Sequence, residues 1–184
     1  MYYKIKKNKV NLSEDSICAK AFVLLQSLLP RSRLAHNKTN AKKKRLYSIK
    51  ESLDSFMVVC ATETEYKQMY DCKVQAESSI APFISLIGTL DEPQSFMIDF
   101  DNIIYKVFNF AKAVDICFKA YHVFNMAYAE PCAAMWDFIN RQFYQLTINA
   151  KPKPGIEALL NEIKIAKETN LEEDTNLPST FTFC

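Results

Sequence analysis

Apolar residues fall into short runs along the chain, and the spacing within each run predicts the elements. Residues 17–28 repeat apolar positions every three or four residues behind a capping Ser13, which predicts a short helix. The compact run SFMVVCA (55–61) has the length and the β-branched content of a buried strand. Thr62 and Glu65 have the spacing of a capping box, so we expect a second helix after that strand.

Two further β-prone runs, FISLIG and FMIDFD, flank a polar turn and predict a β-hairpin at about residues 82–107, in which DNIIYKV extends the second strand or adds a third. After residue 109 the period becomes helical, in two segments rich in aromatic residues that Pro131 separates. We therefore expect an α+β fold: a small antiparallel or mixed sheet around the hairpin, covered by helices, with an aromatic helical hairpin toward the C-terminus.

Composition divides the chain into three parts. Residues 1–45 are predicted to be a basic N-terminal arm with one short helix, and residues 46–148 the α+β core domain. Residues 149–184 begin with the rigid sequence KPKPG, and we expect them to form a linker, a short helix and a disordered tail.

The bulk composition limits the class of protein. Of the 184 residues, 49% are hydrophobic and only 2 are Gly, as in a packed globular protein. The 6 cysteines lack the spacing of a zinc site, which favours free thiols in an intracellular protein. The apolar runs are shorter than the roughly 20 residues that a membrane span needs, so we expect no membrane association.

Charge is distributed unevenly and provides the main functional lead. Residues 1–50 hold 13 Lys and Arg against 2 acidic residues, whereas residues 51–184 hold 10 against 19. The basic residues gather at Arg31, Arg33, Lys38, Lys42, Lys43, Lys44 and Arg45. Such blocks serve as nuclear-import signals or contact nucleic-acid phosphates without sequence preference, and they are equally common as solvated loops.

Asp99 and Asp101 are the only candidate metal ligands that we single out. Their D-x-D spacing at a strand end places both carboxylates on one face, where they could hold a divalent ion of a hydrolase. The same pattern is typical of a strand that leaves the sheet with acidic residues on its solvent face. No second carboxylate cluster supports the metal, so we expect no metal and no other cofactor.

The aromatic segment carries a histidine and two cysteines, but their spacing argues against catalysis. His122 lies five residues from Cys117, which points the two side chains well apart on a helix, so we reject a catalytic pair. We expect most of the segment to be core. The residues that we expect to reach a protein interface are Tyr121, Tyr128, Trp136 and Tyr144.

The motif A-x-D-x-C-F-K-x-Y-H-V-F-N, from Ala113 to Asn125, followed by W-x-F-I, from Trp136 to Ile139, resembles a family of uncharacterised animal proteins. Some members are joined to sterile-alpha-motif domains, and the family has a transposon-like distribution. The resemblance covers roughly residues 20–148, and Tyr128-Ala129 replaces the usual Tyr-Pro. It implies one folded unit and no activity.

Together these patterns predict a non-enzymatic intracellular interaction module with an unknown protein partner, whose basic arm serves nuclear import or nonspecific nucleic-acid contact. The alternative is a protein–protein adaptor without a nucleic-acid role. A metal-dependent hydrolase using Asp99 and Asp101 is the less favoured possibility.

Overall fold

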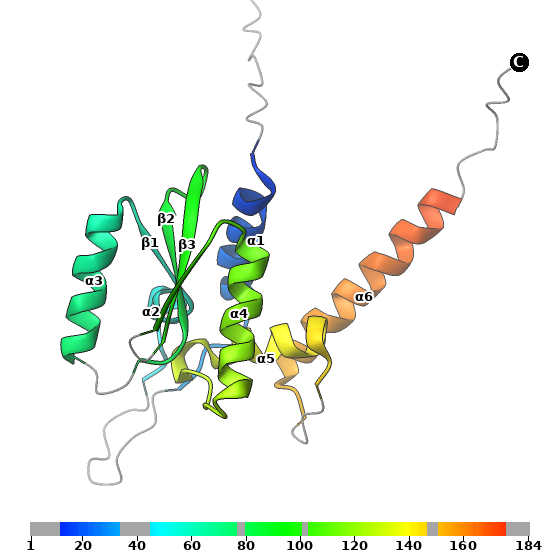
Figure 1. Ribbon diagram of the computed structural model, residues 1–184. Helices are drawn as coiled ribbons and strands as arrows, with labels where there is room; N and C mark the ends of the chain where they lie inside the picture. The colour runs from blue at the N-terminus through cyan, green and yellow to red at the C-terminus, as the bar shows by residue number, and fades with distance from the viewer. Residues whose placement is uncertain (1–11, 34–44, 77–79, 101–102, 147–150, 176–184) are drawn as a thin grey trace, which may run out of the picture.

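Four strands form one mixed sheet in the order β1-β2-β3-β4 (Figure 1). They span Met57–Cys60 (β1), Phe83–Gly88 (β2), Pro93–Phe100 (β3) and Ile103–Val107 (β4). β1 runs parallel to β2, and the other pairs are antiparallel. This computed structural model describes residues 12–33, 45–76, 80–100, 103–146 and 151–175. The predicted α+β fold around a hairpin is confirmed, and the run IIYKV forms a separate strand.

Helices cover both faces of the sheet. Within the described residues they are α1 (Glu14–Leu28), α2 (Ile49–Phe56), α3 (Glu63–Ala76), α4 (Phe110–Val123), α5 (Ala133–Ile139) and α6 (Pro154–Thr175), with a 3₁₀ turn η1 (Glu130–Cys132) and a π-helical turn η2 (Asn140–Tyr144). Figure 1 shows α3 on one side of the sheet and α1 and α4 on the other. None of these described helices has the length and hydrophobicity of a membrane span.

Local sequence accounts for where the elements begin and end. The Ser13 side chain accepts a hydrogen bond from the backbone N–H of Ser16, as expected for the predicted cap of α1. At the hairpin, Gly88 has a φ of +107°, and a Cβ atom there would lie 2.6 Å from the Glu92 carbonyl oxygen. Only glycine fits this position. β3 then starts at Pro93, which is tolerated because it is the first residue of the strand.

The main core lies between the sheet and helices α1, α2, α4 and α5. Phe22 of α1 stacks on Phe56 at 5.8 Å and meets Phe110 edge-on at 5.2 Å between ring centroids. Trp136 of α5 packs against both Phe56 and Tyr121 of α4, at 4.9 and 5.3 Å. α4 and α5 thus meet through the rings of Tyr121 and Trp136.

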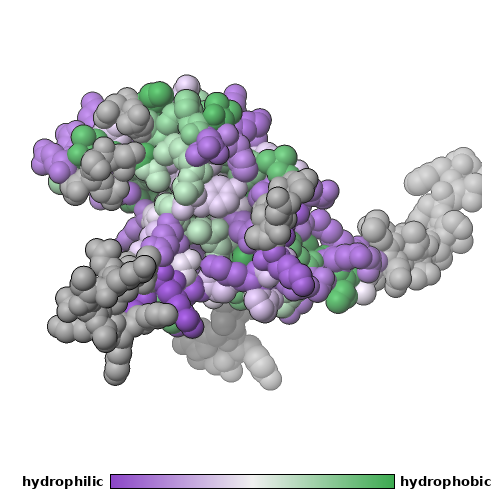
Figure 2. All heavy atoms as spheres, turned by 90° about the horizontal axis from the view of Figure 1, so that it is seen from below, coloured by the Kyte–Doolittle hydropathy of each residue, from purple (hydrophilic) through white to green (hydrophobic). Residues whose placement is uncertain are grey.

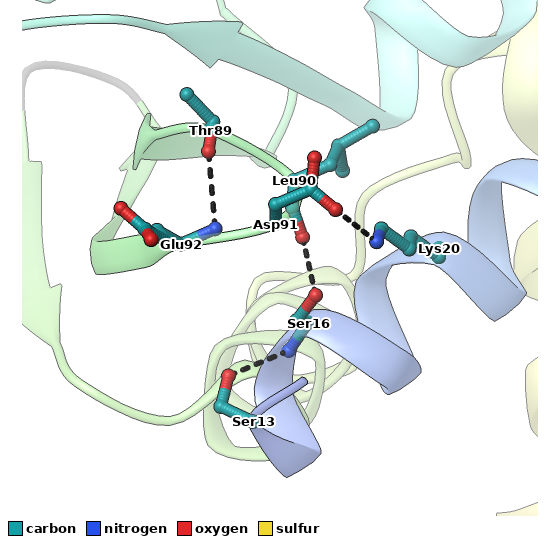
Figure 3. A network of polar contacts seen from close by, with 7 residues as sticks. All are labelled: Ser13, Ser16, Lys20, Thr89, Leu90, Asp91 and Glu92. Atoms are coloured by element: carbon teal, nitrogen blue, oxygen red, sulfur yellow. Dashed lines mark hydrogen bonds and ion pairs between the residues drawn. The ribbon is translucent and has the colours of Figure 1, made fainter. Parts of the chain in front are cut away.

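Helix α1 is also joined to the β2–β3 turn by polar contacts (Figure 3). The Ser16 hydroxyl donates to the Leu90 carbonyl at 2.6 Å, and Lys20 forms an ion pair with Asp91. Within the turn, Glu92 N–H donates to the Thr89 hydroxyl at 3.0 Å. The helix of the predicted basic arm therefore packs on the predicted core domain.

The start of α6 belongs to the same core, because Ile156 is fully buried there. The predicted division at residues 45 and 148 stays a prediction, since much of the arm and the end of the tail lie outside the described residues.

Candidate interaction surface

Strand β4 forms one edge of the sheet and exposes apolar side chains. Ile103, Ile104 and Tyr105 are between 42% and 47% exposed. On one side β4 pairs with β3, and among the described elements nothing pairs with its other side. The strand therefore presents outward-pointing backbone N–H and C=O groups beside large hydrophobic side chains.

The register of β4 on β3 shows apolar residues on both faces of the strand, although Lys106, which forms an ion pair with Glu63 of α3, shares one face with Ile104. Tyr105 lies opposite Ile98 on the side of the main core, whereas Ile104 lies opposite Asp99 on the side of α3. A half-buried edge strand usually alternates apolar and polar residues. β4 departs from that alternation, so a contact on either face would cover hydrophobic surface.

The chain that follows β4 and the end of α4 enlarge this surface. Phe108 is 72% exposed, Val123 75% and Phe124 54%. Phe100 holds the two parts together, because its ring contacts Tyr105 at 6.1 Å and Phe124 at 5.2 Å. We call Ile103, Ile104, Tyr105, Phe108, Val123 and Phe124 the β4 surface. Figure 2 shows the molecule from below, with hydrophobic residues in its upper half and others toward the lower right, interspersed with hydrophilic ones.

The opposite edge of the sheet provides a contrast. β1 has only four residues, and of these Val59 alone is exposed, at 41%. A short edge strand with one exposed apolar residue offers little for a partner to pair with. The two edges therefore differ in length and in the hydrophobic surface beside them.

Two of the four aromatic residues predicted to reach an interface are buried instead. Tyr121 and Trp136 are nearly or fully inaccessible, because they form the ring contacts between α4 and α5. The Tyr121 hydroxyl donates to the Pro82 carbonyl at 2.9 Å, which satisfies its polar end inside the core. Tyr128 and Tyr144 are partly exposed. Tyr144 stacks on Phe118 at 3.9 Å and donates to Asp115 at 2.7 Å.

The described members of the basic cluster lie at the two ends of the segment. Arg31 is exposed, and Arg33 forms an isolated β-bridge with Leu46. Arg45 forms an ion pair with Glu51 in the first turn of α2, and hydrogen bonds from Ser48 hold the pKa of Glu51 below its usual value. Lys38, Lys42, Lys43 and Lys44 lie outside the described residues, so their role stays a prediction.

Asp99 does not lie on a solvent face. Its carboxylate is fully buried beneath α3, where it accepts hydrogen bonds from the hydroxyls of Tyr66 and, at 3.3 Å, Ser85. Burial raises the pKa of Asp99 to about 6, and the two hydrogen bonds offset part of the rise. Asp101 lies outside the described residues. Among the described side chains no cluster of three or more His, Cys, Asp and Glu could hold a metal ion.

His122 and Cys117 are separated as the helical spacing predicts. Cys117 is buried in the core, and burial raises the pKa of its thiol well above its usual value. His122 is exposed, and its Nε2 atom lies 3.0 Å from the Tyr128 hydroxyl oxygen. A thiol in this setting keeps its proton and has no access to a substrate.

Sequence reasoning missed the β4 surface, although it identified the segment as a strand. The signal was present in the run IIYKV, where adjacent apolar residues occupy both faces of a strand. Such a run is also typical of a strand buried on both sides. Only the edge position in the sheet distinguishes the two cases.

Comparison with family models, curated proteins and solved structures finds no match to this chain. The resemblance of Ala113–Asn125 to the uncharacterised animal family therefore stays a prediction.

Proposed function

We propose that this chain is a non-catalytic interaction module that binds an extended segment of a protein partner along β4. The observation that carries the proposal is the edge strand itself, whose outer side pairs with no other described strand and which exposes Ile103, Ile104 and Tyr105. An extended segment added to such an edge forms backbone hydrogen bonds, and its alternate side chains contact the two faces.

The composition of the β4 surface supports a specific contact. Its six residues are 42% to 75% exposed, and three of them are aromatic, a residue class that is enriched at protein interfaces. Apolar edges are normally shortened, charged or covered because they promote aggregation. β4 has five residues and carries Lys106, but Ile103, Ile104 and Tyr105 stay exposed on this edge. A partner segment would cover this one.

The proposal can be tested with a displayed library of random peptides selected on the purified protein. Selected peptides are expected to protect the backbone amides of β4 from hydrogen exchange. Tyr105→Lys is expected to abolish their binding, since it places a charge in the contact. Val59→Lys is the matched control, because it adds the same charge at the opposite, equally exposed edge.

Equal loss of binding in both variants, or protection elsewhere in the chain, contradicts the β4 contact. Sedimentation equilibrium identifies one special case. If the protein forms a dimer that Tyr105→Lys dissociates and Val59→Lys does not, the partner is a second copy of this chain.

A second candidate function rests on the excess of positive charge in residues 1–50. The basic segment 31–45 would serve nuclear import or contact nucleic-acid phosphates nonspecifically. Binding to duplex and single-stranded nucleic acid across a salt series tests the second of these. We expect a steep loss of affinity with salt that replacement of Lys42–Arg45 by Ala removes. If the protein does not bind nucleic acid at any salt concentration, nuclear import remains as the proposed role of the basic segment. A cellular localisation assay of the same variant tests that role.

A further inference from the structure

A cavity of about 540 Å³ opens beside the C-terminal end of α4. Its walls come from the turn that follows α4, from α5 and η2, and from the residues just ahead of α6. None of the six residues of the β4 surface lines the cavity, although Val123 and Phe124 stand in the chain between the lining residues His122 and Asn125. It therefore needs its own explanation.

The turn after α4 has a closed hydrogen-bond pattern. Asn125 adopts the left-handed conformation with a φ of 50°. Its N–H donates to the His122 carbonyl at 3.2 Å, and the Met126 N–H donates to the Tyr121 carbonyl at 2.8 Å. This pattern is a Schellman motif. It occupies two of the last carbonyls of α4, so they do not present free acceptors to the cavity.

The opposite wall contains a π-helical turn. η2 continues α5, and the Gln145 N–H closes it by donating to the Asn140 carbonyl. The side-chain oxygen of Asn140 accepts from the Leu146 N–H at 3.1 Å, which fixes the orientation of a buried amide that lines the cavity. π-helical turns are frequent at functional sites.

The charged side chains that line the cavity are mainly cationic. Lys151 and Lys153 lie just ahead of α6. Arg141 lies on η2, one turn after Asp137 of α5. The Arg141 Nε atom donates to Asp137 at 2.8 Å, and the two side chains are only 18% and 23% exposed. This bond orients the guanidinium group. Three cations against one carboxylate leave an excess of two positive charges.

The remaining polar side chains are amides, an imidazole and hydroxyls, each of which both donates and accepts hydrogen bonds. His122 and Tyr128 form a hydrogen-bonded pair on the wall of the cavity. Burial raises the pKa of Tyr128 to about 12, so the hydroxyl keeps its proton at neutral pH. Met126 and Ala127 add apolar surface beside them. The cavity thus combines cations, neutral donors and an apolar wall.

We propose that this cavity binds a phosphate monoester group. A phosphate monoester carries a charge of about −1.5 to −2 at neutral pH and presents three acceptor oxygens, which matches the charge excess and the donors of the cavity. Arg and Lys form short, charge-assisted hydrogen bonds to such oxygens. The organic part of the ligand would contact Met126 and Ala127. The group can belong to a small metabolite or to a phosphorylated side chain of a peptide.

The test is a calorimetric titration of the whole protein with three phosphate probes: inorganic phosphate, O-phosphoserine, and a hexapeptide that carries one phosphoserine and no other charged side chain. The unphosphorylated hexapeptide is titrated as a control. We expect binding of at least one probe, weakened about tenfold or more in the double variant Lys151→Gln/Lys153→Gln. The control Lys67→Gln/Lys112→Gln removes the same charge from exposed helix positions away from the cavity and should leave the affinity unchanged.

Each outcome decides the proposal. No binding of any probe at millimolar concentration overturns it, as does an equal loss in the two double variants, which would indicate only a general effect of net charge.

Tighter binding of the phosphopeptide than of its unphosphorylated form and of free O-phosphoserine supports a peptide source. Similar affinity for the three phosphate probes supports a small ligand. Tyr105→Lys, at the β4 surface, should not change any of these affinities, so this proposal and the proposed function fail separately.

Discussion

The two faces of the sheet are covered in different ways. One face packs against α1, α2, α4 and α5 through a large cluster of aromatic and aliphatic side chains, including Ile98 and Trp136. In the part of the chain that the structure describes, the other face is covered by α3 alone, through a small cluster of Cys60, Tyr66 and Ile87. Only the second face buries a carboxylate, that of Asp99.

This difference shows two ways of placing a helix on a sheet. Apolar contacts stabilise in proportion to the area that they bury, but they have little directional preference. Hydrogen bonds constrain distance and angle. On the α3 face the bonds from Tyr66 and Ser85 to Asp99 position a helix that buries little apolar surface, at the cost of a buried carboxylate whose pKa is raised to about 6.

The largest expected effect distinguishes the packing of the two faces. Ile98→Ala in the large cluster should lower the free energy of unfolding by about 4 kcal/mol, and Ile87→Ala in the small cluster by about 2 kcal/mol. Both side chains are almost fully buried. The difference arises because a single helix can move to fill a cavity, whereas α4 and α5 are held by several neighbours. Urea denaturation measures both values, and equal losses would contradict the comparison.

The next effect concerns the charge of Asp99. Because the folded-state pKa is raised to about 6 from an ordinary 3.8, the folded protein binds this proton more tightly than the unfolded chain. Its contribution to stability is therefore complete below about pH 4, falls as the pH rises to about 6, and is then constant. Asp99→Asn keeps an acceptor for Tyr66 and removes the charge. It should raise the free energy of unfolding at pH 7 by up to about 3 kcal/mol.

At pH 4 the same variant should be close to wild type, because Asp99 is then protonated in the folded protein. Thermal unfolding measured from pH 4 to pH 7 checks this slope. A variant that is less stable than wild type across the whole range would show that the ionised carboxylate is favourable in its site.

The smallest effect tests the hydrogen bond that positions α3. Tyr66→Phe removes one of the two donors to Asp99 and should lower the free energy of unfolding at pH 7 by about 1–2 kcal/mol. The loss should shrink toward pH 4, where the carboxyl group is neutral. Tyr70→Phe, on the neighbouring turn of α3, is the control for removal of a hydroxyl from this helix. A loss for Tyr66→Phe that does not change with pH would argue against a role for the charged form.

Much of the fold could be predicted because its signals are local. Ser13 caps α1, and Gly88 closes the β2–β3 turn. The aromatic spacing around Phe118 and Tyr121 produces the predicted helix α4, and the run at 55–61 contains the predicted strand β1. Each of these depends on residues that are close in sequence, so periodicity and capping are sufficient.

The candidate sites were harder to predict, because exposure depends on what covers each residue. Strand alternation places Asp99 on the face opposite Ile98, but it does not reveal that α3 covers that face. Tyr121 and Trp136 were expected at an interface and form core contacts instead. Arg141 and Lys151 meet at one cavity only because η2 and the chain ahead of α6 come together.

The sequence by itself determined the element types, the hairpin and the aromatic helix pair, because helix period, strand alternation and turn chemistry act over a few residues. The tertiary structure alone decided which face of each element meets solvent. It placed β4 at an edge with its apolar residues exposed, buried Asp99 under α3, and gathered the cations of the cavity. The physical reason is that burial and charge proximity depend on contacts between segments distant in the chain, and local patterns do not contain that information.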